Sequence, residues 1–222
     1  MKYPNNIYLG IVYDAMRISG HKSEHFFIDI KPKIPIKKTI YGPAFTTKGR
    51  KVKKNEDYEK LDMIRIDMYQ KKYFNNHPIV ILEANDQKCA HSGDITSQIY
   101  KSLGAKGFVT DGNVRDLDLI SKLNFPTFCK DVNPIDAINY WALTEYQIPI
   151  SIQNVKISPN DIIFASSEGI IVVGKKDISK FDKNIISLIK KEAGVRSLVN
   201  KIKNKSSYKK DLTRYIKKNG RW

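Results

Sequence analysis

Three charged residues stand at a spacing that could perform chemistry on a small organic acid. Asp94 is followed, after twenty intervening residues, by the adjacent pair Arg115 and Asp116. The planar guanidinium of an arginine binds a carboxylate through two parallel hydrogen bonds. Carboxylates bind hard divalent ions such as Mg²⁺ or Mn²⁺ and can also transfer protons. The set therefore suits a 2-oxo acid whose enolate is stabilised by a metal and by Arg115.

Substrate binding is expected where a predicted helix begins. The backbone N–H groups in the first turn of a helix are free to bind an anion, and the helix dipole adds to this attraction. We therefore expect the substrate carboxylate to contact Gly93, Ile95, Thr96 and Arg115.

The two carboxylates are expected to have different roles. Asp116 is the best-placed metal ligand, whereas Asp94, or a water molecule that it orients, could move the proton. Structural interpretations remain open for both. Asp94 could only cap a helix, which is worth about 1 kcal/mol. Arg115 and Asp116 could form only a surface ion pair, and Asp111-Gly112 could be only a turn.

Alternating strands and helices should position these residues. The pattern of apolar residues predicts strands at 78–83, 107–111 and 124–129, and an amphipathic helix at 94–103 that ends at Gly104. If the first two strands are neighbours, the turn before Asp94 and the loop before Asp116 open at one edge of the sheet. Ligands of α/β proteins bind at such edges. The alternation thus favours an α/β domain.

The remaining segments complete one domain with an added β-rich layer. The pattern predicts a helix at 7–20, proline-punctuated strands at 26–46, a charged surface loop and a short helix at 48–68, strands with a hairpin at 148–174, and a helix at 180–203. We expect one main domain over residues 1–200 and a basic C-terminal tail over residues 201–222.

Composition excludes several classes of protein. The chain has 222 residues, of which 41% are hydrophobic, and no run approaches the roughly 18 apolar residues that cross a bilayer. The N-terminus lacks the apolar stretch of a secretory signal, so a cytoplasmic protein without a membrane partner is expected. Cys89 and Cys129 lie in apolar surroundings and are expected to be reduced thiols. The four histidines show no zinc-protease spacing.

The formal charge of +16 suggests a polyanionic partner, but its distribution weakens that interpretation. Residues 201–222 hold nine Lys or Arg against the single acid Asp211, which is half of the excess. The other half is spread over 200 residues, where a compositional bias towards Lys explains it. Nucleic acid is therefore disfavoured as the main partner.

The block from Ala90 to Asp116 resembles the family of class II pyruvate aldolases that cleave 4-hydroxy-4-methyl-2-oxoglutarate and 4-carboxy-4-hydroxy-2-oxoadipate. That family also includes the RraA-like regulators of ribonuclease E activity. Further similar segments include Phe125–Phe128 and Glu168–Val173, so the resemblance covers about residues 5 to 195. It implies an RraA-like, three-layer β/β/α fold similar to swivelling domains, assembled as a homotrimer or a hexamer with active sites between subunits.

The resemblance also implies an activity. The aldolase branch is marked by the set found at Asp94, Arg115 and Asp116, in which the arginine holds the pyruvyl carboxylate and the last aspartate the Mg²⁺. A glutamate from the C-terminal helix of a neighbouring subunit lies near the metal, and Glu192 is the candidate. The implied reaction is release of pyruvate from a 4-hydroxy-2-oxo acid, with oxaloacetate decarboxylation through the same enolate. The alternative is a non-catalytic regulator that binds a protein or RNA.

Overall fold

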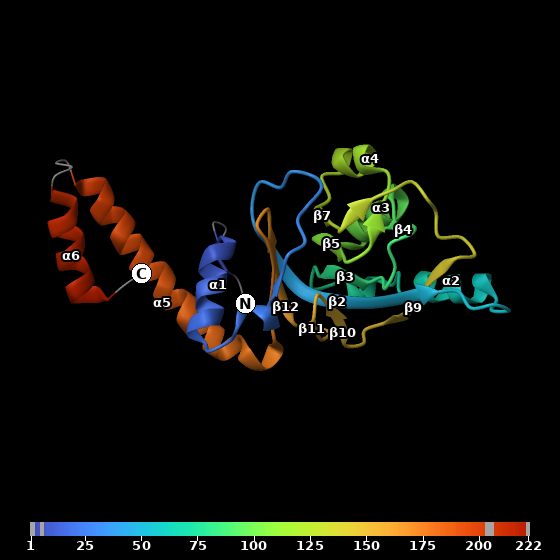
Figure 1. Cartoon of the computed structure of the whole chain (residues 1–222), viewed down its shortest axis with the longest axis horizontal. Helices are drawn as coiled ribbons and strands as arrows, with labels where there is room; N and C mark the ends of the chain where they lie inside the picture. Colours follow the sequence, from blue (N-terminus) through green and yellow to red (C-terminus); the bar gives the residue numbers. More distant parts are fainter. Residues whose placement is uncertain (1–2, 5–6, 203–206, 221–222) are drawn as a thin grey trace.

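The computed structural model describes residues 3, 4, 7–202 and 207–220. Its centre is an eight-stranded mixed sheet, in which the order is β1-β13-β12-β2-β3-β5-β7 and β9 pairs with β2 (Figure 1). The strands are β1 (Phe27–Ile28), β2 (Ile40–Lys51), β3 (Ile79–Glu83), β5 (Gly107–Thr110), β7 (Thr127–Phe128), β9 (Trp141–Tyr146), β12 (Ile162–Ser166) and β13 (Gly169–Val173).

Two smaller β units accompany this sheet. A three-stranded parallel sheet has the order β4-β6-β8, and β10 and β11 form an antiparallel hairpin. The strands are β4 (Ala90–Ser92), β6 (Asn113–Val114), β8 (Asp131–Val132), β10 (Ile150–Ile152) and β11 (Val155–Ile157). The second sheet was not predicted, because strands of two or three residues carry no periodicity.

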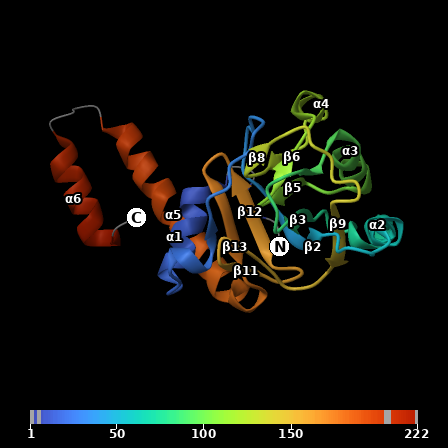
Figure 2. The same cartoon turned by 45° about the vertical axis from the view of Figure 1, so that its right-hand side comes forward.

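Helices lie at both ends of the β layers (Figure 2). They are α1 (Leu9–Ile18), α2 (Tyr58–Asp67), α3 (Asp94–Leu103), α4 (Leu117–Lys122), α5 (Ile178–Lys201) and α6 (Tyr208–Asn219), with short 3-10 turns η1 (Ser23–His25), η2 (Lys71–Tyr73) and η3 (Lys175–Asp177). Helices α3 and α4 lie at one end of the molecule and α5 and α6 at the other (Figures 1 and 2). The α/β architecture predicted from the alternation is confirmed.

The central strands hold the loops of interest at one edge. All five residues of β3 are buried, as expected for a parallel strand covered on both faces. β3 pairs in parallel with β5, with Ile79 opposite Gly107 and Leu82 opposite Thr110. The two strands are therefore neighbours, and the segments that follow them leave the sheet side by side. Helix α3 has the predicted bounds and ends at Gly104, whose φ of 108° is left-handed.

One prediction in this region was wrong. Residues 48–51 were expected in a surface loop, but β2 continues to Lys51 because it finds a second partner in β9. The register shifts between Lys48 and Gly49, and a Cβ at Gly49 would lie 1.9 Å from the ring of Trp141. The strand can pass Trp141 only because residue 49 is glycine. This long-range pairing outweighs the polar sequence of the segment.

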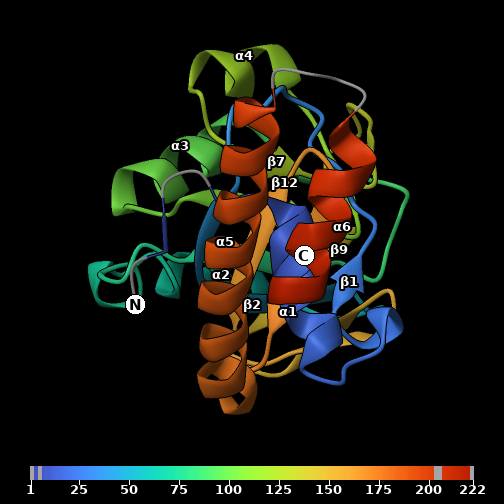
Figure 3. The same cartoon turned by 90° about the vertical axis from the view of Figure 1, so that its left-hand side faces the viewer.

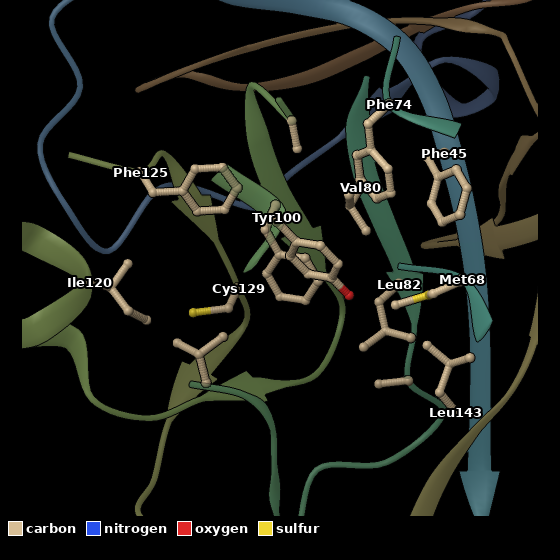
Figure 4. Close-up of a cluster of buried hydrophobic side chains, with 14 of the residues drawn as sticks. Phe45, Met68, Phe74, Val80, Leu82, Tyr100, Ile120, Phe125, Cys129 and Leu143 are labelled. Carbon is tan, nitrogen blue, oxygen red and sulfur yellow. The ribbon is translucent and has the colours of Figure 1, made fainter. Parts of the chain in front are cut away.

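The main core lies between β2, β3, β5 and helices α2 to α4. Figure 4 shows the rings of Phe45, Phe74 and Tyr100 packed against Val80 and Leu82. The cluster continues to Ile120, Phe125 and Cys129 under α4. Cys89 and Cys129 are free thiols, and both are fully buried, more deeply than the partial burial that was expected. This packing fixes α3 and α4 relative to the ends of β3 and β5.

Only the first part of α5 is anchored in the body. Phe181, Ile185 and Leu188 are buried in the cluster that contains α1, and Asn184 Nδ2 donates to Ser19 Oγ at 2.8 Å. After Glu192 the only buried residue of α5 is Val195. Residues 201–222, predicted to be a basic tail, contain α6, which packs beside α5 (Figure 3). None of the helices in the described ranges is long and apolar enough to cross a membrane.

Candidate active site

Short parallel strands bring the two predicted loops together. After β3 the chain forms β4, and after β5 it forms β6, which pairs in parallel with β4. The backbone N–H of Arg115 donates to the carbonyl of Ser92 at 3.0 Å. Asp111 adds a second tie, because its Oδ1 accepts the N–H of Ala84 at 2.7 Å. Burial raises the pKa of Asp111, although this hydrogen bond opposes the shift.

Gly93 is the point at which the predicted residues meet. It is the N-cap of α3, and a Cβ built there would lie 2.5 Å from Asp116 Oδ2. The same Cβ would lie 3.3 Å from Arg115 Cγ and 3.4 Å from Arg115 Nε. The side chains of Arg115 and Asp116 thus lie directly over the first turn of α3. The missing side chain of Gly93 leaves the space that they occupy.

Asp116 has an unusual backbone conformation. Its φ of 62° and ψ of 35° are left-handed, a region that aspartate tolerates better than most residues. It is the N-cap of α4, yet its carboxylate caps no helical N–H. Oδ2 instead lies 3.4 Å from Arg115 Nε, and both side chains are partly exposed. The ion pair between Arg115 and Asp116 that was considered from the sequence therefore exists. Its side chains pack over Gly93, and a pair that only stabilised the surface would not need this position.

Asp94 is the first residue of α3, whereas Gly93 is its N-cap. The capping interpretation of Asp94 is therefore wrong. Its carboxylate makes no hydrogen bond or ion pair with any residue that the structure describes. Of the other expected substrate contacts, Ile95 is 70% exposed. Thr96 lines the neighbouring pocket.

That pocket has a volume of about 180 Å³ and lies between α2, the 90–96 turn and the 136–143 segment. Its polar lining includes Arg115, Ser92, Thr96 and Arg65, whose NH2 group pairs with Asp62 at 2.6 Å. The lining also contains apolar side chains, among them Ile138, Trp141 and Leu143. The sequence had not pointed to Arg65 or to residues 136–143, because only tertiary contacts bring them to the site.

A family model described as "RraA-like: Aldolase/RraA" matches residues 11–172, which is most of the chain. The chain belongs to the RraA-like family. This family includes 4-hydroxy-4-methyl-2-oxoglutarate aldolases and RraA regulators.

Individual members of the RraA-like family are distant relatives of the chain. A "Putative 4-hydroxy-4-methyl-2-oxoglutarate aldolase" of Halalkalibacterium halodurans is 34% identical over 114 residues, 51% of this chain and 52% of that protein. The chain thus matches about half the length of that relative. An uncharacterized protein of Methanocaldococcus jannaschii is 29% identical over 173 residues, 77% of each chain.

A solved structure confirms the RraA-like fold. RraAS2 of Streptomyces coelicolor, described as an unusual member of the RNase ES inhibitor RraA protein family, superposes with a TM-score of 0.71. The superposition covers 86% of this chain and 91% of that one, at 17% sequence identity. The RraA-like α/β fold expected from the sequence is therefore correct.

The RraA-like chain also contains a compact buried cluster that was not predicted. Asp86 Oδ2, Cys89 Sγ and His91 Nε2 lie between 3.5 and 3.7 Å from one another. Among the described residues, this is the group whose spacing could hold a metal ion. The sequence signal would have been the close succession of an acid, a thiol and an imidazole at positions 86, 89 and 91.

The hydrogen bonds of this cluster argue against a metal. The backbone N–H of Asn113 donates to His91 Nδ1 at 3.2 Å, so a neutral imidazole must carry its proton on Nε2. Nε2 then has no lone pair for a metal. Burial raises the pKa of the Cys89 thiol to about 12, so the cysteine without a metal is a neutral thiol. We interpret the cluster as a hydrogen-bonded support for the Ser92–Gly93 turn.

The burial of His91 in this cluster predicts how the free energy of unfolding depends on pH. Burial lowers the pKa of His91, and the nearby Asp86 carboxylate only partly opposes the shift. The unfolded chain therefore binds this proton more readily than the folded chain, and stability is lost as the pH falls below about 6.5. In urea unfolding from pH 7 to pH 5, we expect His91→Asn to show a weaker pH dependence than the wild type.

The matched control is His25→Asn, because His25 is an exposed residue of η1. It should keep the wild-type pH dependence of the free energy of unfolding. Equal pH dependence in the wild type and His91→Asn would show that His91 is not the titrating group.

Glu192 does not lie at this site within one chain. It belongs to α5, at the end of the molecule opposite α3 and α4 (Figures 1 and 2). Its carboxylate accepts hydrogen bonds from the hydroxyl of Tyr8 and from Arg196, whose NH2 lies 3.0 Å away. A role at the metal therefore requires a second subunit, as the resemblance implied.

The donor chemistry near Gly93 suits a hard divalent ion, although Asp94 and Asp116 lie outside the described group whose spacing could hold a metal. Asp94 and Asp116 offer carboxylate oxygens, the donors that Mg²⁺ and Mn²⁺ prefer. The buried Ser92 hydroxyl lines the pocket beside Arg115, which does not include Asp94 or Asp116, and it has no hydrogen-bond partner among the described residues. Such an orphaned group is consistent with a missing ligand or ordered water.

Proposed function

We propose that the chain is a divalent-metal-dependent carbon–carbon lyase that releases pyruvate from a 4-hydroxy-2-oxo acid. Oxaloacetate decarboxylation is proposed as a second reaction of the same site, because both reactions pass through the enolate of pyruvate. The observation that carries the proposal is the packing of Arg115 and Asp116 over Gly93, with the unpaired Asp94 at the next position.

The binding step follows from the position of Arg115. Its guanidinium would hold the C1 carboxylate of the substrate, and the N–H groups that begin α3 would contact the same anion. Asp116 would hold the divalent ion, which supplies a Lewis acid for the negative charge that develops on the 2-oxo oxygen. Only interactions that become stronger as this charge develops accelerate the reaction.

The proton transfers are assigned to Asp94. Asp94, or a water molecule that it orients, would accept the proton of the 4-hydroxyl group while the C3–C4 bond breaks. The bonding electrons pass into the enolate of pyruvate, and C4 leaves as a carbonyl compound. Return of a proton to C3 gives pyruvate. A carboxylate without a competing partner suits this exchange, since no structural hydrogen bond has to be broken first.

The pocket beside Arg115 would receive the rest of the substrate. Arg65 lines it and supplies a second cation, although its pairing with Asp62 reduces its net charge. Ile138 and Leu143 provide apolar contacts. Asp62 and Asp136 also line the pocket and balance its two arginines, so a short carbon chain with a polar end matches this lining.

The proposed contribution of Glu192 leads to a prediction about assembly. We expect an oligomer, a trimer or hexamer, whose sites combine Asp116 of one subunit with Glu192 of another. Glu192→Gln and Asp116→Asn proteins should each be nearly inactive. Co-refolding the two should restore part of the activity, because some mixed interfaces contain both intact residues.

Glu24→Gln is the matched control, since Glu24 is an exposed residue of η1. It should retain wild-type activity. Light scattering should be measured on every sample. A fully active monomer, or mixed oligomers that stay inactive, would contradict the shared site.

The function itself is tested by measuring pyruvate release from 4-hydroxy-4-methyl-2-oxoglutarate and from oxaloacetate. Activity should require Mg²⁺ or Mn²⁺ and should be lost with a chelator. The alternative is a non-catalytic regulator that binds a protein or RNA, which the basic C-terminal segment favours. Chelator-insensitive or absent activity in the folded protein would favour that alternative.

A further inference from the structure

The end of the chain forms a helical arm, which we define as residues 190–201 of α5 together with α6. The arm extends away from the sheets, and α5 and α6 lie side by side in it (Figures 1 and 3). It lies outside residues 11–172, which match the RraA-like family. Of the residues assigned to the candidate active site, the arm contains Glu192, which lies in its α5 part, and none lies in α6.

Positive charge dominates the described part of the arm. Its basic residues are Lys190, Lys191, Arg196, Lys201, Lys209, Lys210, Arg214, Lys217 and Lys218. It contains two acids, Glu192 and Asp211, and each lies near an arginine, at 3.0 Å from Arg196 and 3.9 Å from Arg214. The seven lysines have no acidic partner among the residues that the structure describes.

The two faces of α6 differ in character. Leu212, Tyr215 and Ile216 are partly buried, and the hydroxyl of Tyr215 donates to the carbonyl of Lys191 at 3.2 Å. A Cβ at Gly194 would lie 2.4 Å from that hydroxyl, so the two helices are in close contact. The opposite face is exposed and basic, with residues Lys210, Arg214 and Lys217, and the exposed Lys209 and Lys218 lie on its flanks.

We propose that the basic outer face of α6 in this arm binds the phosphate backbone of a nucleic-acid strand. Positions 210, 214 and 217 or 218 place one cation on the outer face in each turn, about every 6 Å along α6. Such a row can neutralise successive phosphates and release their counterions. The absence of an acid that would pair with the lysines leaves their charge available.

Two other partners fit the arm less well. A helix that lies on a lipid surface inserts its apolar face, but the apolar face of α6 contacts α5. A protein partner usually buries aromatic, Met and Arg side chains, and Lys is depleted from such interfaces. The outer face of α6 is instead rich in Lys, the residue that such interfaces lack. Its chemistry is therefore that of a phosphate contact surface.

The arm could keep this function in the proposed oligomer. Glu192 contacts Tyr8, whereas α6 contacts α5 at Lys191 and Gly194. The exposed lysines lie on the far side of α6 from this contact. A subunit that received Glu192 would therefore not have to cover the basic face.

The experiment is fluorescence anisotropy with the full chain and a labelled 20-nucleotide single-stranded RNA, a DNA single strand and a DNA duplex, each from 50 to 200 mM KCl. We expect dissociation constants on the order of 10⁻⁶ to 10⁻⁴ M that weaken steeply with salt. Combined Lys210→Glu, Lys217→Glu and Lys218→Glu should weaken binding at least about tenfold. The salt slope should fall by about 2 to 3, since each lost contact removes about 0.7 to 0.9.

The matched control reverses three exposed lysines of the body, Lys53, Lys54 and Lys122, and so changes the net charge equally. It should bind within about threefold of the wild type, because contacts rather than net charge dominate. Circular dichroism should show unchanged helix content, and lyase activity should be the same in both triple variants. Equal losses in the two variants would overturn the proposal. The proposal would also be overturned if the wild type did not bind at 50 mM KCl. The same holds if polyglutamate competed as strongly as an unlabelled nucleic acid.

Discussion

Asp116→Asn should lower the rate of pyruvate release by about 10² to 10³, the loss expected when one stabiliser of developing charge is removed. It should also weaken divalent-ion binding, because an amide lacks the negative charge of the ligand. The fold should persist, since asparagine also tolerates the left-handed conformation and the carboxylate caps no helical N–H. Activity assays and calorimetric titration with Mn²⁺ measure the two effects.

The neighbouring residues refine this test. Arg115→Lys keeps the charge but loses the planar fork, so both KM and kcat should deteriorate. Asp94→Asn should lower kcat strongly while changing stability by less than about 1 kcal/mol, because Asp94 contributes only a charge near the helix start.

The control for these variants is Asp118→Asn, an exposed acid two residues after Asp116. It should retain wild-type activity and Mn²⁺ affinity. Wild-type rates in all three site variants would exclude the proposed lyase chemistry at this site.

Gly93→Ala should cause the second large loss, about 10-fold to 10²-fold in kcat, with little loss of stability. The φ of −138° and ψ of −162° at Gly93 are accessible to alanine. The added Cβ would, however, lie 2.5 Å from Asp116 Oδ2. The carboxylate can rotate away, so the fold tolerates the methyl group while the site is displaced. A shift of about 1 Å can cost 10² in rate.

Gly10→Ala is the control, since Gly10 is an exposed residue of α1 and a Cβ there meets only the Tyr8 ring, at 3.4 Å. It should keep full activity and slightly raise stability, because alanine favours the helix by up to about 1 kcal/mol. Thermal unfolding and kinetic assays distinguish the two substitutions. If Gly93→Ala were fully active, the close packing of Asp116 over Gly93 would have no catalytic importance.

Local sequence patterns identified the elements that repeat over many residues. Helix α3 was predicted with its observed bounds, because apolar spacing and Gly104 both specify a helix that ends there. The strand β3 was recognisable as an uninterrupted apolar run. With the strand predicted at 107–111, the sequence placed the Asp94 and Arg115 loops at one edge of the sheet on the condition that the two strands are neighbours, and the structure shows that they are.

Other features depend on partners that are distant in the chain. The β4-β6-β8 sheet is made of two- and three-residue segments that become strands only by pairing with one another. Residues 48–51 are strand because β9 pairs with them, although their sequence is typical of a loop. Arg65 and the 136–143 segment reach the pocket through packing of α2 and β9 around β2 and β3.

The candidate site shows the same division. Residue type and spacing along one stretch of chain made Asp94, Arg115 and Asp116 candidates but left structural interpretations open, and the resemblance to the RraA-like family selected the same set. The packing of Asp116 over Gly93, the free carboxylate of Asp94 and the protonation of the His91 cluster were decided by tertiary structure. Side-chain distances and burial depend on which segments fold against one another, and no local periodicity encodes those contacts.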